Sequence, residues 1–385
     1  MTVAQISSCV VSHSLSFAWR RDSVIGFIVL YGFLLLIFDA FHPAFYPSTI
    51  TNCCSVETAF LIRRSPMTTI TACPIAFLNQ TNSFPAPSAE VVDSIQAYLC
   101  HLAAQGGPQP SEYSQLNTVI DVLAEWLRKG ALTPEQWHAI RTSLGDAIST
   151  DTIQGMALHK PHGYAGDYEI IDRIYQYYVS DNPSLANWDK FFHSHSAPKA
   201  VRNRVSYFLS QVWDAHLRHP QEARILNLAS GPGRDMYEAL KVLGKTPVYF
   251  DCLDQDKQAI DYASRLCADY SAQITFFHCN VFRFKPARSY HLIWSAGLFD
   301  YFTDALFKRV LKRLLPALAP GGKLVIGNFS DRNPSKGYME LFDWILNHRS
   351  EEHLRQLAED CGVAPANIAI DQEPEGVNLF LHIQG

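Results

Sequence analysis

The feature that most constrains the fold is a glycine-containing turn followed by an acidic residue at a fixed distance. Residues 225–235 read ILNLASGPGRD, a short apolar run that breaks into small residues before an expected helix over 236–243. Gly231 and Gly233 have no Cβ, so the backbone there can approach a ligand closely. Asp254 ends a second expected strand, 21 residues after Gly233, where it can accept hydrogen bonds from both hydroxyls of a ribose. The pattern predicts a nucleotide-binding turn.

A dinucleotide-binding fold uses the same order of strand, turn, helix, strand and acid, but the glycine spacing argues against it. The G-x-G-x-x-G pattern requires a third glycine or alanine where this chain has Met236. The small residues at 229–233 resemble instead motif I of the class I S-adenosylmethionine (SAM)-dependent methyltransferases. Residues 290–298 resemble the fourth strand and exit loop of that family, and residues 314–326 resemble its L-x-P-G-G turn and fifth strand. Four matches in the family's order favour this assignment.

This resemblance implies an α/β fold of the Rossmann-like class I methyltransferase type, a seven-stranded mixed sheet with helices on both faces. It also implies SAM as the cofactor. Asn280 stands where related enzymes contact adenine through Asp, and Ala229 replaces a glycine of motif I. The residues expected to bind the cofactor are Tyr164, Asp167, Ala229, Ser230, Gly231, Gly233, Asp254, Gln255, Asn280, Val281, Ser295 and Gly297.

Motif I departs from its common form in a second way. Asn227 occupies a position that is often acidic, so it lacks the charge that could bind the ammonium group of the methionine part of the cofactor. Another carboxylate must then do this, and we expect Asp167 or Asp300 to supply it. Asp167 has a structural alternative as the N-cap of a helix expected over 168–179.

A polar, glycine-rich segment at 159–169 interrupts a helical region, and its residues 163–167 are here named the GYAGD loop. The interpretations are a tight connection or a loop that closes over the cofactor. At this point the chain resembles a narrower family, the methyltransferases that make the methyl ester of 3-hydroxypalmitic acid, a bacterial extracellular signal. The motifs shared with it are GYAGDYE at 163–169, ASGPGRD at 229–235, GLFDY at 297–301 and a pattern of residues over 327–349. The resemblance covers roughly residues 90–385.

Methyl transfer to a fatty carboxylate needs no general base, because the carboxylate is already ionised at pH 7. It needs donors that hold and partly desolvate the carboxylate. Each candidate side chain also has an interpretation in which it does not contact substrate: a packed aromatic ring, a side chain that caps a turn, a solvated histidine or an arginine in a surface ion pair. The candidate catalytic residues are Tyr164, Tyr301, Asn328, His162 and Arg349.

Helical periodicity dominates residues 89–220, here named the cap, and strands alternate with helices over 221–385, the expected methyltransferase domain. Thr133, Pro134 and Gln136 predict the start of one cap helix. Aromatic side chains in this region could form a groove for an acyl chain or simply a core. They are Tyr175, Tyr177, Tyr178, Phe191, Phe192, Tyr207, Phe208 and Trp213.

The amino-terminal part contains a hydrophobic segment that does not indicate the fold. Residues 24–38 carry no charge but are fewer than the about 20 residues of a membrane-spanning helix. The interpretations are a membrane anchor over 24–46 or a translated upstream region before a start at Met67, since no clear cleavage site supports a secretory signal. Residues 1–66 are therefore an uncertain hydrophobic extension, and residues 67–88 are expected to form a linker.

Composition limits the partners. Nine scattered cysteines, without spacing suited to zinc, predict free thiols in a reducing cytoplasm and no metal site. The formal net charge of −5 gives no reason to expect nucleic-acid binding. The resemblance to the narrower family implies a small-molecule fatty acid as the partner, and membrane contact is expected only through 24–46.

The motifs thus predict a SAM-dependent methyltransferase, and the resemblance to the narrower family implies carboxyl O-methylation that makes the methyl ester of a 3-hydroxy fatty acid, a quorum-sensing signal controlling virulence. Two alternatives stay open. One is a methyltransferase that acts on another small molecule, and the other is a SAM-binding regulatory protein that turns nothing over.

Overall fold

The computed structural model describes residues 87–385, all of which belong to one compact unit. The predicted extension over 1–66 and all but the last two residues of the predicted linker lie outside the described residues. Within 87–385, every helix is too short or too polar to cross a lipid bilayer.

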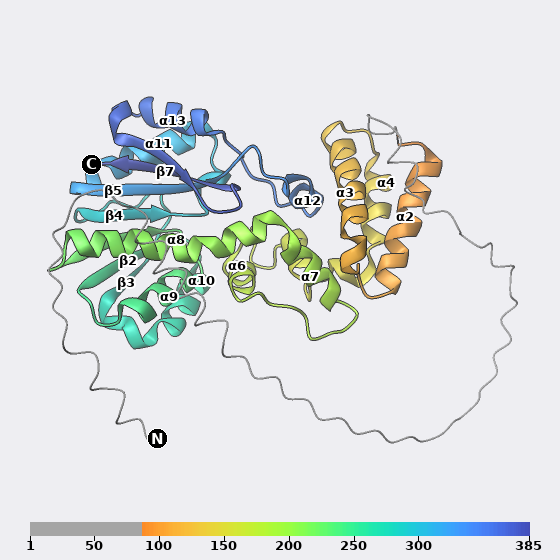
Figure 1. Cartoon of the computed structure of the whole chain (residues 1–385), viewed down its shortest axis with the longest axis horizontal. Helices are drawn as coiled ribbons and strands as arrows, with labels where there is room; N and C mark the ends of the chain where they lie inside the picture. The colour runs from red at the N-terminus through yellow and green to blue at the C-terminus, as the bar shows by residue number, and fades with distance from the viewer. Residues whose placement is uncertain (1–86) are drawn as a thin grey trace, which may run out of the picture. The chain divides into compact units, whose positions relative to one another are not determined.

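A seven-stranded mixed sheet forms the carboxyl-terminal half, in the order β3-β2-β1-β4-β5-β7-β6 (Figure 1). Neighbouring strands from β3 to β5 pair in parallel, and β7 runs antiparallel to both β5 and β6. This confirms the predicted α/β fold class. The strands are β1 (Ala223–Leu228), β2 (Val248–Asp254), β3 (Ile274–His278), β4 (Tyr290–Ser295), β5 (Leu318–Phe329), β6 (Ile368–Gln372) and β7 (Asn378–Gln384).

Helices cover both faces of this sheet. Successive side chains of a strand point to opposite faces, so neighbouring residues belong to different cores. Leu226 and Ile293 join one core with apolar side chains of α11 and α13, whereas Ile225 and Trp294 join another with α8 and α9. The helices concerned are α8 (Ser196–Arg218), α9 (Arg234–Leu243), α10 (Lys257–Leu266), α11 (Asp304–Leu314) and α13 (Glu351–Glu359).

The cap is helical, and its core is completed from a distant part of the chain. Tyr338, Leu341 and Trp344 follow β5 in sequence but belong to the cap core. Their segment, residues 330–348, is here named the α12 segment, and Figure 1 shows α12 beside α3. A Cβ on Gly337 would lie 3.0 Å from the Cβ of Ala124, so the two helices touch closely there. The helices are α2 (Ala89–Ala104), α3 (Tyr113–Arg128), α4 (Pro134–Thr142), α5 (Ile153–His159), α6 (Tyr168–Tyr175), α7 (Ala186–Ser194) and α12 (Lys336–Leu341).

Two predicted helix ends can be compared with the structure. Thr133 caps α4 in a capping box, which confirms the predicted start. The helix predicted over 168–179 was too long, because α6 ends at Tyr175. Tyr177 has a left-handed φ of 52°, and the Tyr178 N–H donates to the carbonyl of Arg173 at 2.9 Å. This is a Schellman-type helix end, formed here without the usual glycine.

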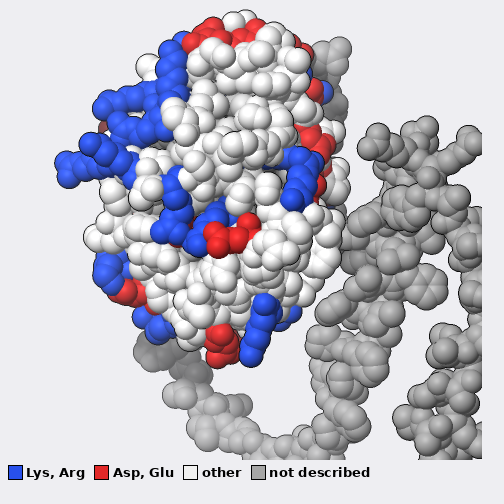
Figure 2. Space-filling view, turned by 90° about the vertical axis from the view of Figure 1, so that its left-hand side faces the viewer, with Lys and Arg blue, Asp and Glu red and all other residues white. Residues whose placement is uncertain are grey.

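Charge is unevenly spread over the surface. Figure 2 shows one face, on which Lys and Arg side chains gather along one edge while Asp and Glu lie in separate small groups among uncharged areas. The expectation that the chain does not bind nucleic acid stays a prediction.

Candidate active site

The turn between β1 and α9 has the backbone conformation that its sequence predicts. Ala229, Gly231 and Gly233 all have positive φ, of 51°, 52° and 67°. No heavy atom lies within 4 Å of the position of a Cβ on Gly231, whereas a Cβ on Gly233 would lie 3.0 Å from the Cβ of Ala263. Gly231 therefore keeps the turn open, and Gly233 lets α9 pack against α10. Ala229 adopts the left-handed conformation despite its Cβ, which costs about 1 kcal/mol.

Asp254 is fixed at the carboxyl end of β2. One carboxylate oxygen accepts a hydrogen bond from the Gly231 N–H and the other accepts one from the Asp256 N–H, both at 2.9 Å. Burial raises the pKa of Asp254 above its ordinary value, although these backbone donors counteract the shift. The carboxylate is thus oriented by the turn that it helps to shape.

A second polar group lies after β3. The Asn280 amide nitrogen donates to the Gln255 side-chain oxygen at 2.7 Å, and the Asn280 side-chain oxygen accepts from the Phe282 N–H at 2.9 Å. Both hydrogen bonds fix the orientation of the Asn280 amide.

These groups line one cavity of about 360 Å³ near the carboxyl ends of the parallel strands, the usual ligand position in such sheets. The predicted site residues on its wall are Tyr164, Ala229, Ser230, Gly231, Asp254, Gln255, Asn280, Val281, Gly297 and Tyr301. The predicted site residues that are not on its wall are His162, Asp167, Gly233, Ser295, Asn328 and Arg349. The structure therefore brings together most of the expected cofactor contacts and separates two groups of side chains from them.

The first separated group anchors the GYAGD loop. Asp167 is buried, and its carboxylate accepts from the N–H groups of Glu169 and Ile170, both at 3.0 Å, as the N-cap of α6. His162 contacts Glu169 at 3.0 Å and Gln258 of α10 at 2.9 Å. Burial lowers the pKa of His162, but its hydrogen bonds and the nearby carboxylates outweigh burial, so that its pKa lies above the ordinary value. Both side chains hold the loop rather than face the cavity.

Two tyrosines connect the GYAGD loop to the cavity wall. The Tyr164 hydroxyl donates to the Asp256 carboxylate at 3.0 Å, and the Tyr301 hydroxyl donates to the Ala165 carbonyl at 2.6 Å. The Trp344 indole N–H donates to the Tyr301 oxygen at 3.1 Å. Gly166 has φ of 70°, and a Cβ there would lie 2.6 Å from that oxygen. The loop is thus held against the cavity by contacts that only glycine permits.

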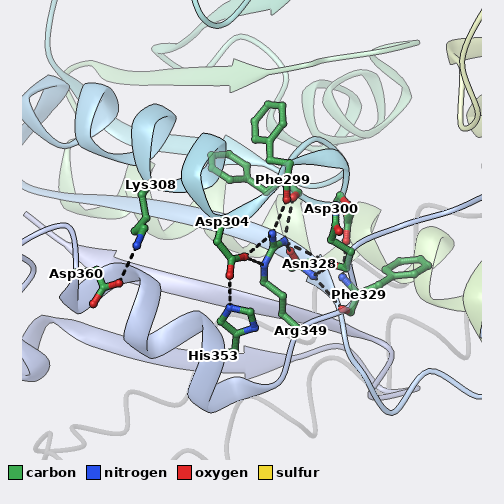
Figure 3. Close-up of polar contacts among 11 residues, drawn as sticks. Phe299, Asp300, Asp304, Lys308, Asn328, Phe329, Arg349, His353 and Asp360 are labelled. Carbon is green, nitrogen blue, oxygen red and sulfur yellow. Dashed lines mark hydrogen bonds and ion pairs between the residues drawn. The ribbon is translucent and has the colours of Figure 1, made fainter.

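The second separated group forms a buried network around Arg349 (Figure 3). Its guanidinium donates to the Asn328 side-chain oxygen at 2.7 Å, the Phe299 carbonyl at 3.1 Å, the Phe302 carbonyl and the Asp304 carboxylate at 3.0 Å. Arg349 is only 2% exposed. These bonds brace the loop that follows β4, so Arg349 and Asn328 support the cavity wall from behind.

Ser295 and the aromatic residues of the cap also have structural surroundings. The Ser295 hydroxyl donates to the Leu228 carbonyl at 3.3 Å between β4 and β1. Of the eight aromatic side chains considered for a groove, Tyr175 lines the cavity. Phe191 and Phe208 are fully buried in two cores, whereas Tyr177 and Trp213 are exposed at the surface.

Three charged residues outside the predicted set of cofactor-binding and catalytic residues also line the cavity. Arg204 of α8 is 6% exposed, and its Nε donates to the Asn378 side-chain oxygen at 2.9 Å. Asp235 lies in the first turn of α9, within the ASGPGRD motif, and Asp300, which the sequence suggested for the ammonium group, follows β4. Burial raises the pKa of each of these two carboxyl groups to about 6. No local pattern distinguished Arg204, because its position depends on how α8 crosses the sheet.

Two buried polar atoms on the cavity wall have no hydrogen-bond partner among the described residues. They are the amide nitrogen of Asn227 and the hydroxyl of Ser230. Buried polar groups are rarely left unpaired in a folded protein. Together with the open space at Gly231 and the oriented carboxylate of Asp254, they fit a ligand that carries ribose hydroxyls and further polar groups. The described residues contain no cluster of His, Cys, Asp and Glu suited to a metal ion.

Residues 223–384 have the class I methyltransferase fold, and the residues that line the cavity fit SAM as the cofactor. A family model described as "Methyltransferase domain" matches residues 225–322, which include the glycine turn, Asp254 and Asn280.

Several solved structures are similar to the chain. A protein described as a possible exported protein from Bordetella parapertussis is 18% identical over 76% of this chain and 96% of that chain, with a TM-score of 0.48. The N-methyltransferase NodS from Bradyrhizobium japonicum is 16% identical over 47% of this chain and 95% of its own, with a TM-score of 0.35. The 1,6-didemethyltoxoflavin-N1-methyltransferase of Burkholderia thailandensis is 15% identical over 51% and 85%, with a TM-score of 0.37. No curated protein matches the sequence.

Proposed function

We propose that this methyltransferase acts in the cytoplasm on the carboxylate of a 3-hydroxy fatty acid similar to 3-hydroxypalmitate, and that the methyl ester is a quorum-sensing signal that controls virulence. The family resemblance of the GYAGD loop and the motifs after β4 and β5 supports this substrate. The observation that carries the proposal is the cavity itself, which is lined by polar groups at the glycine turn and by apolar side chains from the cap, the end of β5 and the α12 segment.

The polar wall would hold the cofactor. Asp254 would accept hydrogen bonds from the ribose hydroxyls, and Gln255 and Asn280 would surround the adenine. Asp300 is the carboxylate that we propose for the ammonium group, because it lines the cavity whereas Asp167 caps α6. SAM supplies a methyl group on a positively charged sulfur, and transfer to a carboxylate leaves S-adenosylhomocysteine and a methyl ester without net proton transfer.

The apolar wall would bind the acceptor. It consists of Ile171, Tyr175, Val201, Phe329, Trp344 and Leu346, contributed by the cap, by the end of β5 and by the α12 segment. Such a wall excludes water from the acceptor carboxylate, which weakens its solvation and favours attack on the methyl group. Positioning accounts for much of the catalysis in this scheme, since a carboxylate needs no base.

One observation favours a second candidate function, methylation of a hydroxyl or amine on another small molecule. Asp235 and Asp300 line the cavity, and burial raises the pKa of each to about 6. Such a carboxylate is largely ionised at pH 7 and has more affinity for a proton than an exposed one. It could therefore serve as a general base, which a carboxylate acceptor does not require.

The experiment that separates these functions uses the full chain, methyl-labelled SAM and 3-hydroxy fatty acids of several lengths, with products identified by mass spectrometry. The proposal predicts labelled methyl esters. The matched control is the same series supplied as preformed methyl esters, which keep the hydroxyl but have no free carboxylate. Labelled methyl ethers from the control series would favour the second candidate, and absence of label from every product would refute fatty-acid methylation.

A further inference from the structure

Arg204 is a buried cation with unused hydrogen-bonding capacity. It is 6% exposed and lines the cavity, and its guanidinium lies over the Phe329 ring, 5.2 Å from the ring centre. Its Nε donates to Asn378, which anchors the side chain to the start of β7. Within residues 87–385, neither terminal nitrogen has a hydrogen-bond acceptor, and no carboxylate forms an ion pair with the group.

The terminal nitrogens lie next to the glycine that follows β4. A Cβ on Gly297 would be 3.2 Å from Nη1, and Gly297 also lines the cavity. Asp235 and Asp300 are close enough for the positive charge of Arg204 to lower their pKa values, but both lie beyond ion-pair distance. The cation is therefore held in place by an amide and a ring, which leaves its planar pair of terminal donors available.

The chemistry of this group selects its ligand. A guanidinium is permanently charged and presents parallel N–H donors whose spacing matches the two oxygens of a carboxylate. A buried charge is costly unless it is paired and hydrogen-bonded. An apolar group of the ligand beside Arg204 would leave those donors unpaired, and a cationic group there would be repelled. This position therefore favours a carboxylate group.

We propose that Arg204 binds a ligand carboxylate in this cavity through its two terminal nitrogens. Two carboxylates are available to a methyltransferase of the proposed function, the one on the methionine part of SAM and the one on the fatty-acid acceptor. The chemistry is the same for both, so the experiment has one arm for each source. The acceptor arm rests on the proposed function, whereas the cofactor arm needs no turnover.

The variants are Arg204→Gln, which removes the charge, and Arg204→Lys, which keeps the charge but loses the paired donors. The matched control is Arg202→Gln on the same helix. Arg202 is half-buried, contacts His193 at 3.0 Å and is not on the cavity wall. Thermal unfolding identifies any variant that loses the fold. The Lys variant keeps the test usable if removal of the buried charge prevents folding.

The cofactor arm compares S-adenosylhomocysteine with 5′-methylthioadenosine by calorimetry on the full chain. The second ligand shares the adenosyl part but has no carboxylate. If Arg204 binds the cofactor carboxylate, Arg204→Gln weakens S-adenosylhomocysteine binding by roughly 10- to 100-fold and leaves 5′-methylthioadenosine binding unchanged. Equal losses for both ligands would show a general disturbance of the cavity and overturn the proposal.

The acceptor arm measures KM for a 3-hydroxy fatty acid at saturating SAM. If Arg204 binds the acceptor carboxylate, KM rises by roughly 10- to 100-fold while S-adenosylhomocysteine affinity is retained. If both quantities stay within about 3-fold of the Arg202→Gln control, the proposal is overturned. A wild-type chain without fatty-acid turnover refutes the proposed function separately, and the cofactor arm alone then decides the role of Arg204.

Discussion

Two arginines, Arg349 and Arg204, are buried to a similar degree but differ in their hydrogen-bond partners. Arg349 and Arg204 are 2% and 6% exposed, so burial does not distinguish them. Arg349 donates to a carboxylate, an amide and two backbone carbonyls behind the loop after β4. Among residues 87–385, Arg204 has one side-chain acceptor, and its terminal nitrogens are unpaired on the cavity wall.

The difference extends to the regions around them. In the network around Arg349, protein groups satisfy one another, so we expect changes there to alter stability. On the cavity wall, polar atoms of Arg204, Asn227 and Ser230 have no partner within the described part of the chain, so we expect changes there to alter binding. Whether a buried polar group is already satisfied is thus a better guide to function than its burial.

The largest effect is expected from Arg349→Met. The substitution leaves the Phe302 carbonyl and the Asn328 side-chain oxygen without their donor and removes one of the two donors to the Phe299 carbonyl, so the free energy of unfolding should fall by roughly 3–5 kcal/mol. Chemical denaturation measures this change, and S-adenosylhomocysteine affinity of the folded fraction should stay within about 3-fold.

The matched control is Arg332→Met. Arg332 forms an exposed ion pair with Glu351, and its loss should cost less than about 1 kcal/mol. An Arg349→Met protein that is as stable as this control would contradict the structural role.

Asp300 shares features of both regions. Its carboxylate accepts from the Phe329 N–H, as in the satisfied network, and it also lines the cavity. Burial raises its pKa from 3.8 to about 6, so between these values the folded state binds the proton more tightly than the unfolded state. Stability should therefore fall as pH rises from about 4 to 6, by up to about 3 kcal/mol for this group. Asp300→Asn should lack this loss, and its stability relative to wild type should improve as pH rises.

Denaturation at pH 4.5 and pH 7.5, both chosen within about one to two units of the shifted value, measures this difference. A variant whose stability relative to wild type is the same at the two values would show that Asp300 titrates as an exposed carboxyl group does.

A smaller effect is expected from Asp254→Asn, and it should appear in binding. The amide cannot accept from Gly231 and Asp256 with both of its polar atoms, so the group is misoriented toward the ribose. S-adenosylhomocysteine affinity should fall roughly 10-fold, about 1.4 kcal/mol, by calorimetry. The control Asp261→Asn removes an exposed carboxylate of α10 that pairs with Lys257 and should leave affinity unchanged. Equal affinities in both variants would remove Asp254 from the binding site.

The smallest effect is expected from Tyr301→Phe. It removes the hydrogen bond to the Ala165 carbonyl and the acceptor for the Trp344 indole, a loss of about 1 kcal/mol. The GYAGD loop should then open more often, with amide hydrogen exchange roughly 5-fold faster at its residues. Tyr177→Phe, at an exposed tyrosine, is the control. Unchanged exchange in Tyr301→Phe would show that other contacts hold the loop.

The features that could be predicted from sequence are those that depend on neighbouring residues. The glycine turn, the helix that follows it and the Thr133 cap follow from backbone conformation, periodicity and capping. The fold class followed from several such elements in the right order. The predicted α6 was too long because a left-handed tyrosine at 177 gives no sequence signal comparable to glycine.

The direction in which a polar side chain points was not predictable in the same way. Asn328 lies near the end of β5 and was expected at the substrate, but its amide donates to the Phe329 and Asn347 carbonyls and accepts from Arg349. Arg204 reaches the cavity only because α8 packs against β1 and β4. Both outcomes depend on contacts between residues far apart in the chain.

The composite core of the cap has a consequence for how the chain is made. Tyr338, Trp344 and Val377 complete a core that begins with Val92, so most of the polypeptide must leave the ribosome before this core can close. During synthesis, the apolar faces of α3 and α7 stay without their final partners until the α12 segment emerges, a period in which exposed apolar surface favours aggregation and chaperone binding. The cap also cannot be transplanted into a related protein as one continuous segment, because residues 330–348 must accompany it.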